Sequence, residues 1–261
     1  MKNYHTHTFR CKHAHGDVAD YAEAAINKGF SLLGMADHTA LPDDRWITMR
    51  MSYAELPQYV EAITHAKTRY PELTILKGME CEWTKEYHNF YAQELLGDYE
   101  FDYLVLGSHF FPYKGRFLSA HMDVGDGNKL AAYTKHLIDS MESRLFAFVA
   151  HPDLFGLTYL NWDKNTIAAS RDILQTAAKL QLPLEINGNG LVTRVINTPQ
   201  GVRTAYPWLK FWELAAEYNV TVVVNSDAHH PEGVDQGMED GMKIVENLGL
   251  ELANLDYLNG R

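Results

Sequence analysis

Seven short apolar runs punctuate this chain, and each ends at or beside a residue that can bind a metal ion. A run such as Phe146-Ala147-Phe148-Val149 lacks polar alternation, which is typical of a strand covered on both faces. The segments between the runs have helical periodicity, so the pattern predicts βα units around a parallel sheet. Seven parallel strands fit a barrel, and barrel enzymes place their chemistry at the carboxyl ends of the strands. The runs are NYHTH (3–7), SLLGMADH (31–38), TILKGME (74–80), YLVLGSH (103–109), FAFVAH (146–151), LPLEIN (182–187) and TVVVNSDAH (221–229).

Capping residues indicate where the first intervening helices begin. Asp17 is placed to cap a first helix that Gly29 closes. Ser52 and Glu55 have capping-box spacing before a second helix near residues 53–69, although Pro57 lies one turn in. Long connections at 39–52, 110–128 and 188–206 are expected to carry substrate contacts, as long loops on rigid scaffolds usually do. Further helices are predicted at about 86–97, 129–142, 165–180, 207–218 and 235–248.

Length and composition favour a single domain over residues 1–261. The chain of 261 residues can bury a large core, and no linker-like stretch, low-complexity tract or solenoid repeat divides it. Its polar start lacks the apolar core of a signal peptide, and no apolar run approaches the roughly 20 residues that cross a bilayer. We therefore expect a cytoplasmic protein without a membrane partner.

Charge and cysteine content argue against a nucleic-acid-binding protein and against a disulfide-stabilised one. The net charge of −11 disfavours nucleic acid as the main partner, because such binding depends on Lys and Arg residues that neutralise phosphates. Cys11 and Cys81 are too few for a disulfide framework. Each lies within a few residues of a candidate ligand, so we expect two reduced thiols packed near a site.

Histidines and carboxylates gather at the ends of the predicted strands. His5 and His7 are two residues apart, so on a strand both imidazoles point to one face and can hold one ion. Imidazole nitrogens and carboxylate oxygens are the ligands that borderline metals prefer. Strand ends that converge in space therefore predict one polynuclear metal site. The other candidates are His13, in the loop after the first run, and, at the later strands, Asp37-His38, Glu80, His109, His151-Pro152-Asp153 and Asp227-Ala228-His229.

These phrases also carry a resemblance to a known family. HTH, CKHA, ADH, KGMECEW, GSHF, AHPD, LEIN and SDAH fall in the order and rough spacing of the polymerase and histidinol phosphatase (PHP) family of metallohydrolases. The match runs from His5 to His229, and HPD followed by LEIN is similar to the histidinol phosphatase branch. The resemblance implies an α/β fold, a distorted seven-stranded (β/α)7 TIM-like barrel. It also implies up to three divalent metals at the carboxyl ends of the strands and hydrolysis of phosphate monoesters.

The resemblance distributes the candidate ligands among three ions. The first ion would be held by His5, His7, Glu80 and Asp227. The second would be bridged by Glu80 and completed by His109 and His151, since the two oxygens of one carboxylate can each serve one cation. The third would be held by His13, His38 and His229, with His15 as an alternative to His13. The ligand types suit Zn, Mn, Fe or Co about equally.

The same resemblance gives the carboxylates their roles. Glu80 and Asp227 are expected to be catalytic through the metal-bridging hydroxide that attacks phosphorus. Asp153 is a candidate acid for the leaving alkoxide. Asp37 precedes a ligand, and two roles remain open for it: orienting an imidazole or capping a turn.

The charge of such a site favours a phosphate ester. Three dications contribute about +6, against about −3 from two carboxylates and a hydroxide, so a dianion is attracted to the remaining charge of roughly +3. The leading hypothesis is conversion of L-histidinol phosphate to L-histidinol and phosphate in histidine biosynthesis. Glu82 and Asp153 are candidates for binding the ammonium and imidazole groups. Arginines that could hold the phosphate are Arg194, which is preferred, and Arg203, Arg116 and Arg45.

Three alternatives remain open at this point. A PHP enzyme could act on nucleotides or short oligonucleotides, although the chain lacks an aromatic and basic stripe. A barrel amidohydrolase also begins with HxH, but it typically carries a carbamylated Lys where His109 stands here. A non-catalytic metal-binding protein would need no open coordination position. The segment from Gly190 to Tyr206 departs from the family pattern, and the sequence does not determine the oligomeric state.

Overall fold

The structure, a computed structural model, describes residues 1–260. Its elements form two compact units that are interleaved along the chain. Unit 1 comprises Met1–Val105, Asn225–Gln236 and the chain from Asn254 onwards, and unit 2 comprises Leu106–Val224 and Gly237–Ala253. The expectation that residues 1–261 act as one domain stays a prediction.

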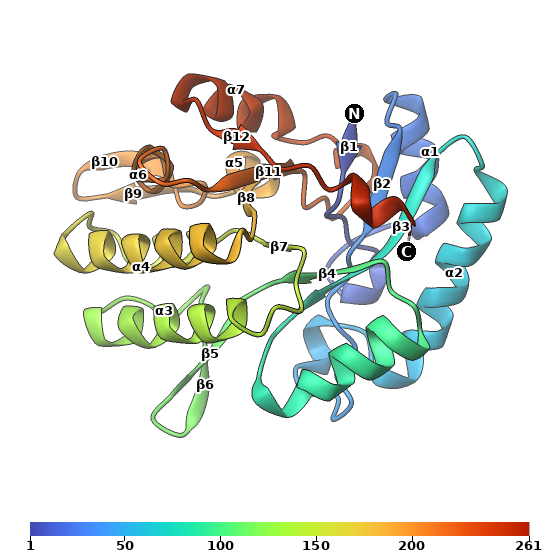
Figure 1. The fold of residues 1–261 in the computed structure, drawn as a ribbon, viewed down its shortest axis with the longest axis horizontal. Helices are drawn as coiled ribbons and strands as arrows, with labels where there is room; N and C mark the ends of the chain where they lie inside the picture. The colour runs from blue at the N-terminus through green and yellow to red at the C-terminus, as the bar shows by residue number, and fades with distance from the viewer. Residues whose placement is uncertain (261) are drawn as a thin grey trace. The chain divides into compact units, whose positions relative to one another are not determined.

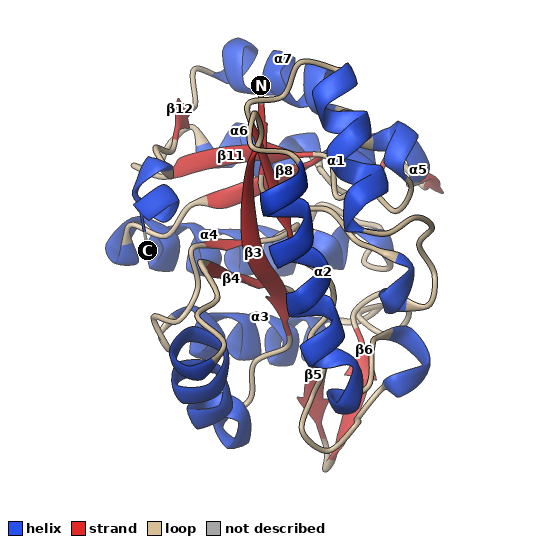
Figure 2. Ribbon diagram, turned by 90° about the vertical axis from the view of Figure 1, so that its right-hand side faces the viewer, coloured by secondary structure: helices blue, strands red, loops and turns tan. Residues whose placement is uncertain are grey.

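Unit 1 is built on four neighbouring strands in the order β1-β2-β3-β4. The first three are parallel, with Lys2 opposite Leu32 and Leu32 opposite Thr74. Helix α2 runs along β3 (Figure 2). The strands and α-helices are β1 (Lys2–Asn3), α1 (Val18–Asn27), β2 (Leu32–Met35), α2 (Leu56–Arg69), β3 (Thr74–Cys81) and β4 (Tyr103–Leu106), whose last residue lies beyond the unit boundary. Short turns of helix are η1 (Phe9–Cys11), η2 (Ile47–Met49), η3 (Tyr53–Glu55), η4 (Lys85–Tyr87), the π-helix η5 (Phe90–Asp98), η7 (Pro231–Gly233) and η8 (Asp256–Gly260).

The predicted caps form at the first two helices. The Asp17 side chain accepts the Val18 N–H at 2.7 Å and forms a capping box with Asp20. Ser52 and Glu55 form the second capping box, which begins the 3-10 turn η3. Helix α2 starts after that turn, three residues later than predicted, and holds Pro57 in its first turn. Proline is tolerated there because its missing N–H would have no partner within the helix.

A buried tyrosine fills the space that two strand glycines leave in unit 1. The Tyr103 hydroxyl donates to the carbonyl of Tyr4 at 2.6 Å. A Cβ on Gly78 would lie 2.3 Å from the Tyr103 ring, and one on Gly34 would lie 2.2 Å from its hydroxyl and 2.8 Å from the Cα of Tyr4. Both strands therefore need glycine at these positions, because a protein core has no spare volume for an added methyl group.

Unit 2 carries the strand order β7-β8-β11-β12, with β7 parallel to β8 and β11 parallel to β12. Helices α3 and α4 lie side by side along their lengths (Figure 1). Two antiparallel hairpins, β5-β6 and β9-β10, complete it. The elements are β5 (Phe110–Tyr113), β6 (Arg116–Ser119), α3 (Gly127–Met141), β7 (Phe148–Val149), η6 (Leu154–Leu157), α4 (Lys164–Leu180), β8 (Leu184–Asn187), α5 (Gly188–Thr193), β9 (Val195–Thr198), β10 (Gly201–Thr204), α6 (Leu209–Ala215), β11 (Thr221–Asn225), α7 (Met238–Leu248) and β12 (Glu251–Leu252).

The structure confirms a strand in or beside each of the seven apolar runs. The loops predicted at 110–128 and 188–206 contain the two hairpins, and the helix predicted at about 86–97 is mostly the π-helix η5. Strand β12 was not predicted. Cys11 and Cys81 are buried free thiols, as expected. Within residues 1–260 no helix combines the length and the apolar character that crossing a bilayer requires.

We predict that Gly34→Ala destabilises the protein. The new methyl group would clash with the Tyr4 backbone. Because a strand backbone cannot shift without straining its neighbours, the free energy of unfolding should fall by about 2–3 kcal/mol. Urea unfolding followed by circular dichroism measures this change. Gly97→Ala is the control, because its Cβ would meet only the Ala92 carbonyl oxygen at an ordinary 3.7 Å. Equal midpoints for Gly34→Ala and the unaltered protein would contradict the packing argument.

Candidate metal centre

Two imidazoles and two carboxylates meet in the interior of unit 1. The Nε2 atoms of His5 and His7 are 3.0 Å apart. Asp227 Oδ1 lies 2.9 Å from His7 Nε2 and 3.5 Å from His5 Nε2. Glu80 Oε2 lies 3.5 Å from His5 Nε2 and 3.6 Å from His7 Nε2. All four residues are at least 95% buried, so the structure brings the four ligands predicted for the first ion together.

The backbone of unit 1 explains this convergence. Beyond β1, Thr6 forms an isolated parallel bridge with Ala228. His7 donates its N–H to the Ala228 carbonyl at 2.9 Å. The two-residue spacing of an extended chain turns both imidazoles to one side. Asp227 has a φ of 50°, a left-handed conformation that is rare for residues other than glycine and often marks functional sites.

The electrostatics of this group require a cation or a bound proton. Burial alone would lower the pKa of His7, but hydrogen bonding to Asp227 and the proximity of Asp37 raise it to about 9. Burial alone would raise the pKa of Asp227, but the imidazoles of His5 and His7 hold it well below its ordinary value. Buried lone pairs that face one another in this way fit a divalent ion, which would replace the proton on His7.

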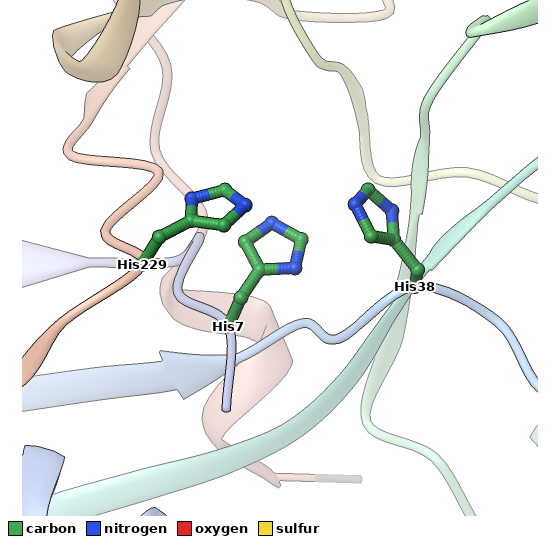
Figure 3. Close-up of side chains that lie close together, drawn as sticks. All are labelled: His7, His38 and His229. Carbon is green, nitrogen blue, oxygen red and sulfur yellow. The ribbon is translucent and has the colours of Figure 1, made fainter. Parts of the chain in front are cut away.

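A second group of imidazoles adjoins the first. One ring nitrogen each of His7, His38 and His229 lies within 4.8 Å of the others, and Figure 3 shows the His7 ring between the other two. His38 Nδ1 is 2.9 Å from Glu80 Oε2, because His38 and Glu80 pair as a parallel bridge at the ends of β2 and β3. Burial and the neighbouring His7 lower the pKa of His229 to about 3, so this imidazole is neutral, as a metal ligand must be.

The structure places His13 beside this second group. Its ring centroid lies 5.3 Å from that of His38 and 5.0 Å from that of His229. The alternative, His15, donates its backbone N–H to the His229 carbonyl at 2.8 Å. The geometry thus favours His13 as the ligand and gives His15 a role in holding the His229 backbone.

Unit 2 holds a separate pair of imidazoles. The Nε2 atoms of His109 and His151 are 3.2 Å apart, and His151 has a left-handed φ of 31°. Glu185, from the LEIN phrase, accepts the backbone N–H of His151 at 3.2 Å and an amide hydrogen of Asn187 at 2.8 Å. Glu185 therefore holds the backbone of a predicted ligand, a role that the sequence did not reveal. The predicted sharing of Glu80 with this pair joins residues of both units and stays a prediction.

Two aspartates near the ligands occupy distinct environments. Asp37 is fully buried, accepts the Thr8 N–H at 3.0 Å and places Oδ1 3.8 Å from His7 Nδ1. This position favours orientation of an imidazole over a turn cap. Asp153 is 1% exposed and accepts hydrogen bonds from the Trp208 backbone N–H and, at 3.1 Å, from the Trp212 indole. Burial raises the pKa of Asp153 to about 7, so it can hold a proton near neutral pH.

Glu82 already has a buried partner that the sequence did not predict. Arg50 is 2% exposed and lies 3.3 Å from Glu82 Oε1. Its guanidinium also donates to the carbonyl of Thr39 at 3.4 Å and lies 5.2 Å from the Trp46 ring centroid. Arg50 therefore ties the segment after His38 to the segment after Glu80. No motif points to this pair, because its members are 32 positions apart.

The four arginines proposed for phosphate differ in their availability. Arg203 stacks 3.7 Å from the Trp208 ring centroid and donates to the main-chain carbonyls of Gly156 and Thr204, each at 2.8 Å. It therefore braces the hairpin and has few donors left for a phosphate. Arg45 pairs with Asp43 and Glu86 at 3.0 and 2.7 Å. The exposed ones are Arg116, on β6, and Arg194, after α5.

Comparison with known proteins identifies the family. The model of the PHP domain matches residues 3–189, which is more than half of the chain. This chain belongs to the PHP domain family. It is 28% identical over 255 residues to a probable histidinol-phosphatase of Deinococcus radiodurans, covering 94% of this chain and 92% of that protein. It is 24% identical to a probable phosphatase of a Shewanella species, covering 93% and 81%.

A solved structure shows the fold of this PHP domain. The histidinol phosphate phosphatase of Lactococcus lactis subsp. lactis, crystallised with Zn, L-histidinol and phosphate, matches with a TM-score of 0.74. The match covers 98% of this chain and 97% of that one at 15% identity. The α/β fold predicted from the seven runs is thereby confirmed. The buried histidine and carboxylate clusters of this PHP-family phosphoesterase fit a multinuclear metal site.

Metal binding to this PHP domain should release protons. A divalent ion must displace the proton from His7, whose pKa of about 9 leaves it protonated at neutral pH in the metal-free protein. We expect release of at least about one proton near pH 7.5, contributed by His7, and affinity that rises about tenfold per pH unit until the pH passes the pKa of His7. Calorimetric titration in buffers of different ionisation enthalpy counts the protons. His65→Gln, at an exposed histidine of α2, should leave the count unchanged, and a count of zero in the unaltered protein would refute the expectation.

Proposed function

We propose that this PHP domain hydrolyses L-histidinol phosphate to L-histidinol and phosphate. The observation that carries the proposal is the buried convergence of His5, His7, Glu80 and Asp227, with His38 within 2.9 Å of Glu80. Such a cluster suits cations that bind a phosphate dianion. The proposal draws further support from two relatives, one named a probable histidinol-phosphatase and one crystallised with L-histidinol and phosphate.

Three divalent ions would be held by the nine predicted ligands, and Zn, Mn, Fe and Co all suit these donors. When bound, the ions would lower the pKa of a coordinated water and neutralise charge on the phosphoryl group. Glu80 and Asp227 would serve catalysis by holding the ions in place. The remaining ligands in this proposal are His5, His7, His13, His38, His109, His151 and His229.

The chain itself would supply the proton for the leaving group. Departure of L-histidinol leaves an alkoxide that must be protonated, and we assign this step to Asp153. Its pKa of about 7 makes the neutral acid plentiful at physiological pH, as a general acid requires. Its second oxygen, Oδ1, accepts no hydrogen bond from the described residues, so it is the atom that would carry the proton.

The candidates for substrate binding are the charged side chains that other groups of the protein do not already neutralise. Glu82 faces Arg50 in the interior, so its charge is already compensated and it is the weaker candidate for the ammonium group. Among the arginines, Arg194 remains the preferred phosphate ligand, since it is exposed, whereas Arg203 donates to backbone carbonyls. A cytoplasmic location is part of the same proposal.

We predict that Asp227→Asn abolishes most phosphatase activity. The amide keeps the shape of the carboxylate but removes the negative charge between His5 and His7. The kcat/KM for L-histidinol phosphate should fall roughly 100-fold or more. Phosphate release measures the rate, and elemental analysis measures the metal content. Glu72→Gln also replaces a carboxylate by an amide, but at an exposed position of unit 1, and it should retain full activity. Equal activity in the two variants would remove Asp227 from the centre.

A substrate panel tests the specific reaction. If the proposal holds, L-histidinol phosphate should be hydrolysed with a kcat/KM at least about 100-fold above that for simple sugar phosphates, because its ammonium and imidazole add contacts near the metal site. Nucleoside bisphosphates and short oligonucleotides complete the panel. Equal turnover of all the esters would refute the assignment of this substrate while leaving phosphoester hydrolysis intact. Preferential turnover of nucleotides would favour the alternative drawn from the sequence.

A further inference from the structure

A buried cysteine lies among the histidines of the outer group. Cys11 Sγ and one ring nitrogen each of His13 and His229 all lie within 4.8 Å of one another. The thiol is 0% exposed, so water does not reach it. The ligand sets considered above leave Cys11 without a role.

The loop that carries Cys11 is held in place at both ends. Thr8 caps the 3-10 turn η1, and Lys12 follows it in a left-handed conformation with a φ of 71°. The Lys12 ammonium pairs with Glu55 at 2.9 Å, at the capping box that precedes α2. Because Lys12 turns the chain, Cys11 and His13 approach His229 from the same loop.

A second cluster also points to a cation near the sulfur. Cys11 Sγ, one ring nitrogen of His7 and one carboxylate oxygen of Asp37 all lie within 4.8 Å of one another, and all three residues are fully buried. A buried thiol, imidazole and carboxylate in one place form a ligand set that suits a divalent cation, and a cation there would offset the cost of burying these polar groups.

We propose that Cys11 is a further ligand, through its thiolate, of the divalent ion held by His13 and His229. Binding forms a sulfur–metal bond and breaks the S–H bond, and the proton leaves to the solvent buffer. A thiolate is a soft ligand, so this position would prefer Zn²⁺, Co²⁺ or Cd²⁺ to Mn²⁺. The proposal rests on the metal binding argued above and is independent of which ester is hydrolysed.

The second cysteine of the chain provides a matched control. Cys81 is also 0% exposed and lies in unit 1, directly after the ligand Glu80 on β3. Its Sγ donates to the carbonyl of Met79 at 3.5 Å. Successive residues of a strand point to opposite faces, so Cys81 points away from the side that Glu80 presents to the imidazoles.

Cobalt substitution tests the proposal directly. Metal-free protein is titrated with Co²⁺, and the intense near-ultraviolet absorption of thiolate-to-cobalt charge transfer is recorded. We expect this band in the unaltered protein and in Cys81→Ser, and its loss in Cys11→Ser, which should keep the weaker visible bands of cobalt bound to nitrogen and oxygen. In competition between Zn²⁺ and Mn²⁺, Cys11→Ser should also lose roughly tenfold or more of the preference for Zn²⁺.

Two outcomes of the cobalt experiment would overturn the proposal. One is the absence of the charge-transfer band from fully loaded unaltered protein, and the other is its persistence in Cys11→Ser. If Cys11→Ser does not fold, Cys11→Ala replaces it, and ¹¹³Cd resonances of the unaltered protein report a sulfur ligand without any variant. Cadmium signals restricted to the nitrogen and oxygen region would equally refute it. A cobalt–thiolate band in a protein without phosphatase activity would refute the proposed function and leave this ligand standing.

Discussion

The structure of unit 1 depends on how the charge around His7 is balanced. Its Nε2 faces His5, Glu80 and Asp227, all within 3.6 Å and all buried. Two unprotonated imidazole nitrogens that face each other at 3.0 Å repel through their lone pairs. One of them therefore carries a proton, or both bind a cation. With its pKa raised to about 9, His7 keeps a proton at neutral pH when no cation is bound. This proton occupies the position that a metal ion would take in the proposed centre.

The scaffold fixes the ligands with backbone conformations that cost energy. Asp227 and His151 both adopt left-handed φ angles, and each such residue costs about 1–3 kcal/mol unless its surroundings enforce it. In unit 1, the bridge between Thr6 and Ala228 holds the backbone next to Asp227. In unit 2, Glu185 accepts the N–H of His151. Strand ends with ordinary φ angles would avoid this energetic cost. We explain the left-handed conformations by the direction in which they point the side chains of Asp227 and His151.

The sequence predicted most of the elements and the residues that gather in unit 1, because both predictions depend on local patterns. The capping box at Ser52 and Glu55 and the alternation of His5 with His7 can be recognised within a few residues of sequence. The ion pair of Arg50 with Glu82 and the hydrogen bond of Glu185 to His151 could not be recognised, because tertiary structure alone brings these partners together. The same limit applies to Arg203, which looks like a loop arginine in the sequence but is bound by backbone carbonyls in the fold. Local patterns therefore identify candidate ligands, and packing determines which charged groups are already paired within the protein.

His7 also couples the two ligand groups of unit 1. Its ring lies between those of His38 and His229, with its centroid 4.4 Å from that of His229 (Figure 3). A proton on His7 is one of the causes that hold the pKa of His229 down, so His229 stays neutral and ready to bind an ion. A dication that replaces this proton puts more charge beside His229 and would weaken binding of a second cation there. A thiolate at Cys11 offsets that added charge, because it places one negative charge next to His13 and His229. Desolvation opposes the binding of neighbouring cations at a buried site. The carboxylates of Glu80 and Asp227 and a thiolate at Cys11 would supply the negative charge that offsets this cost.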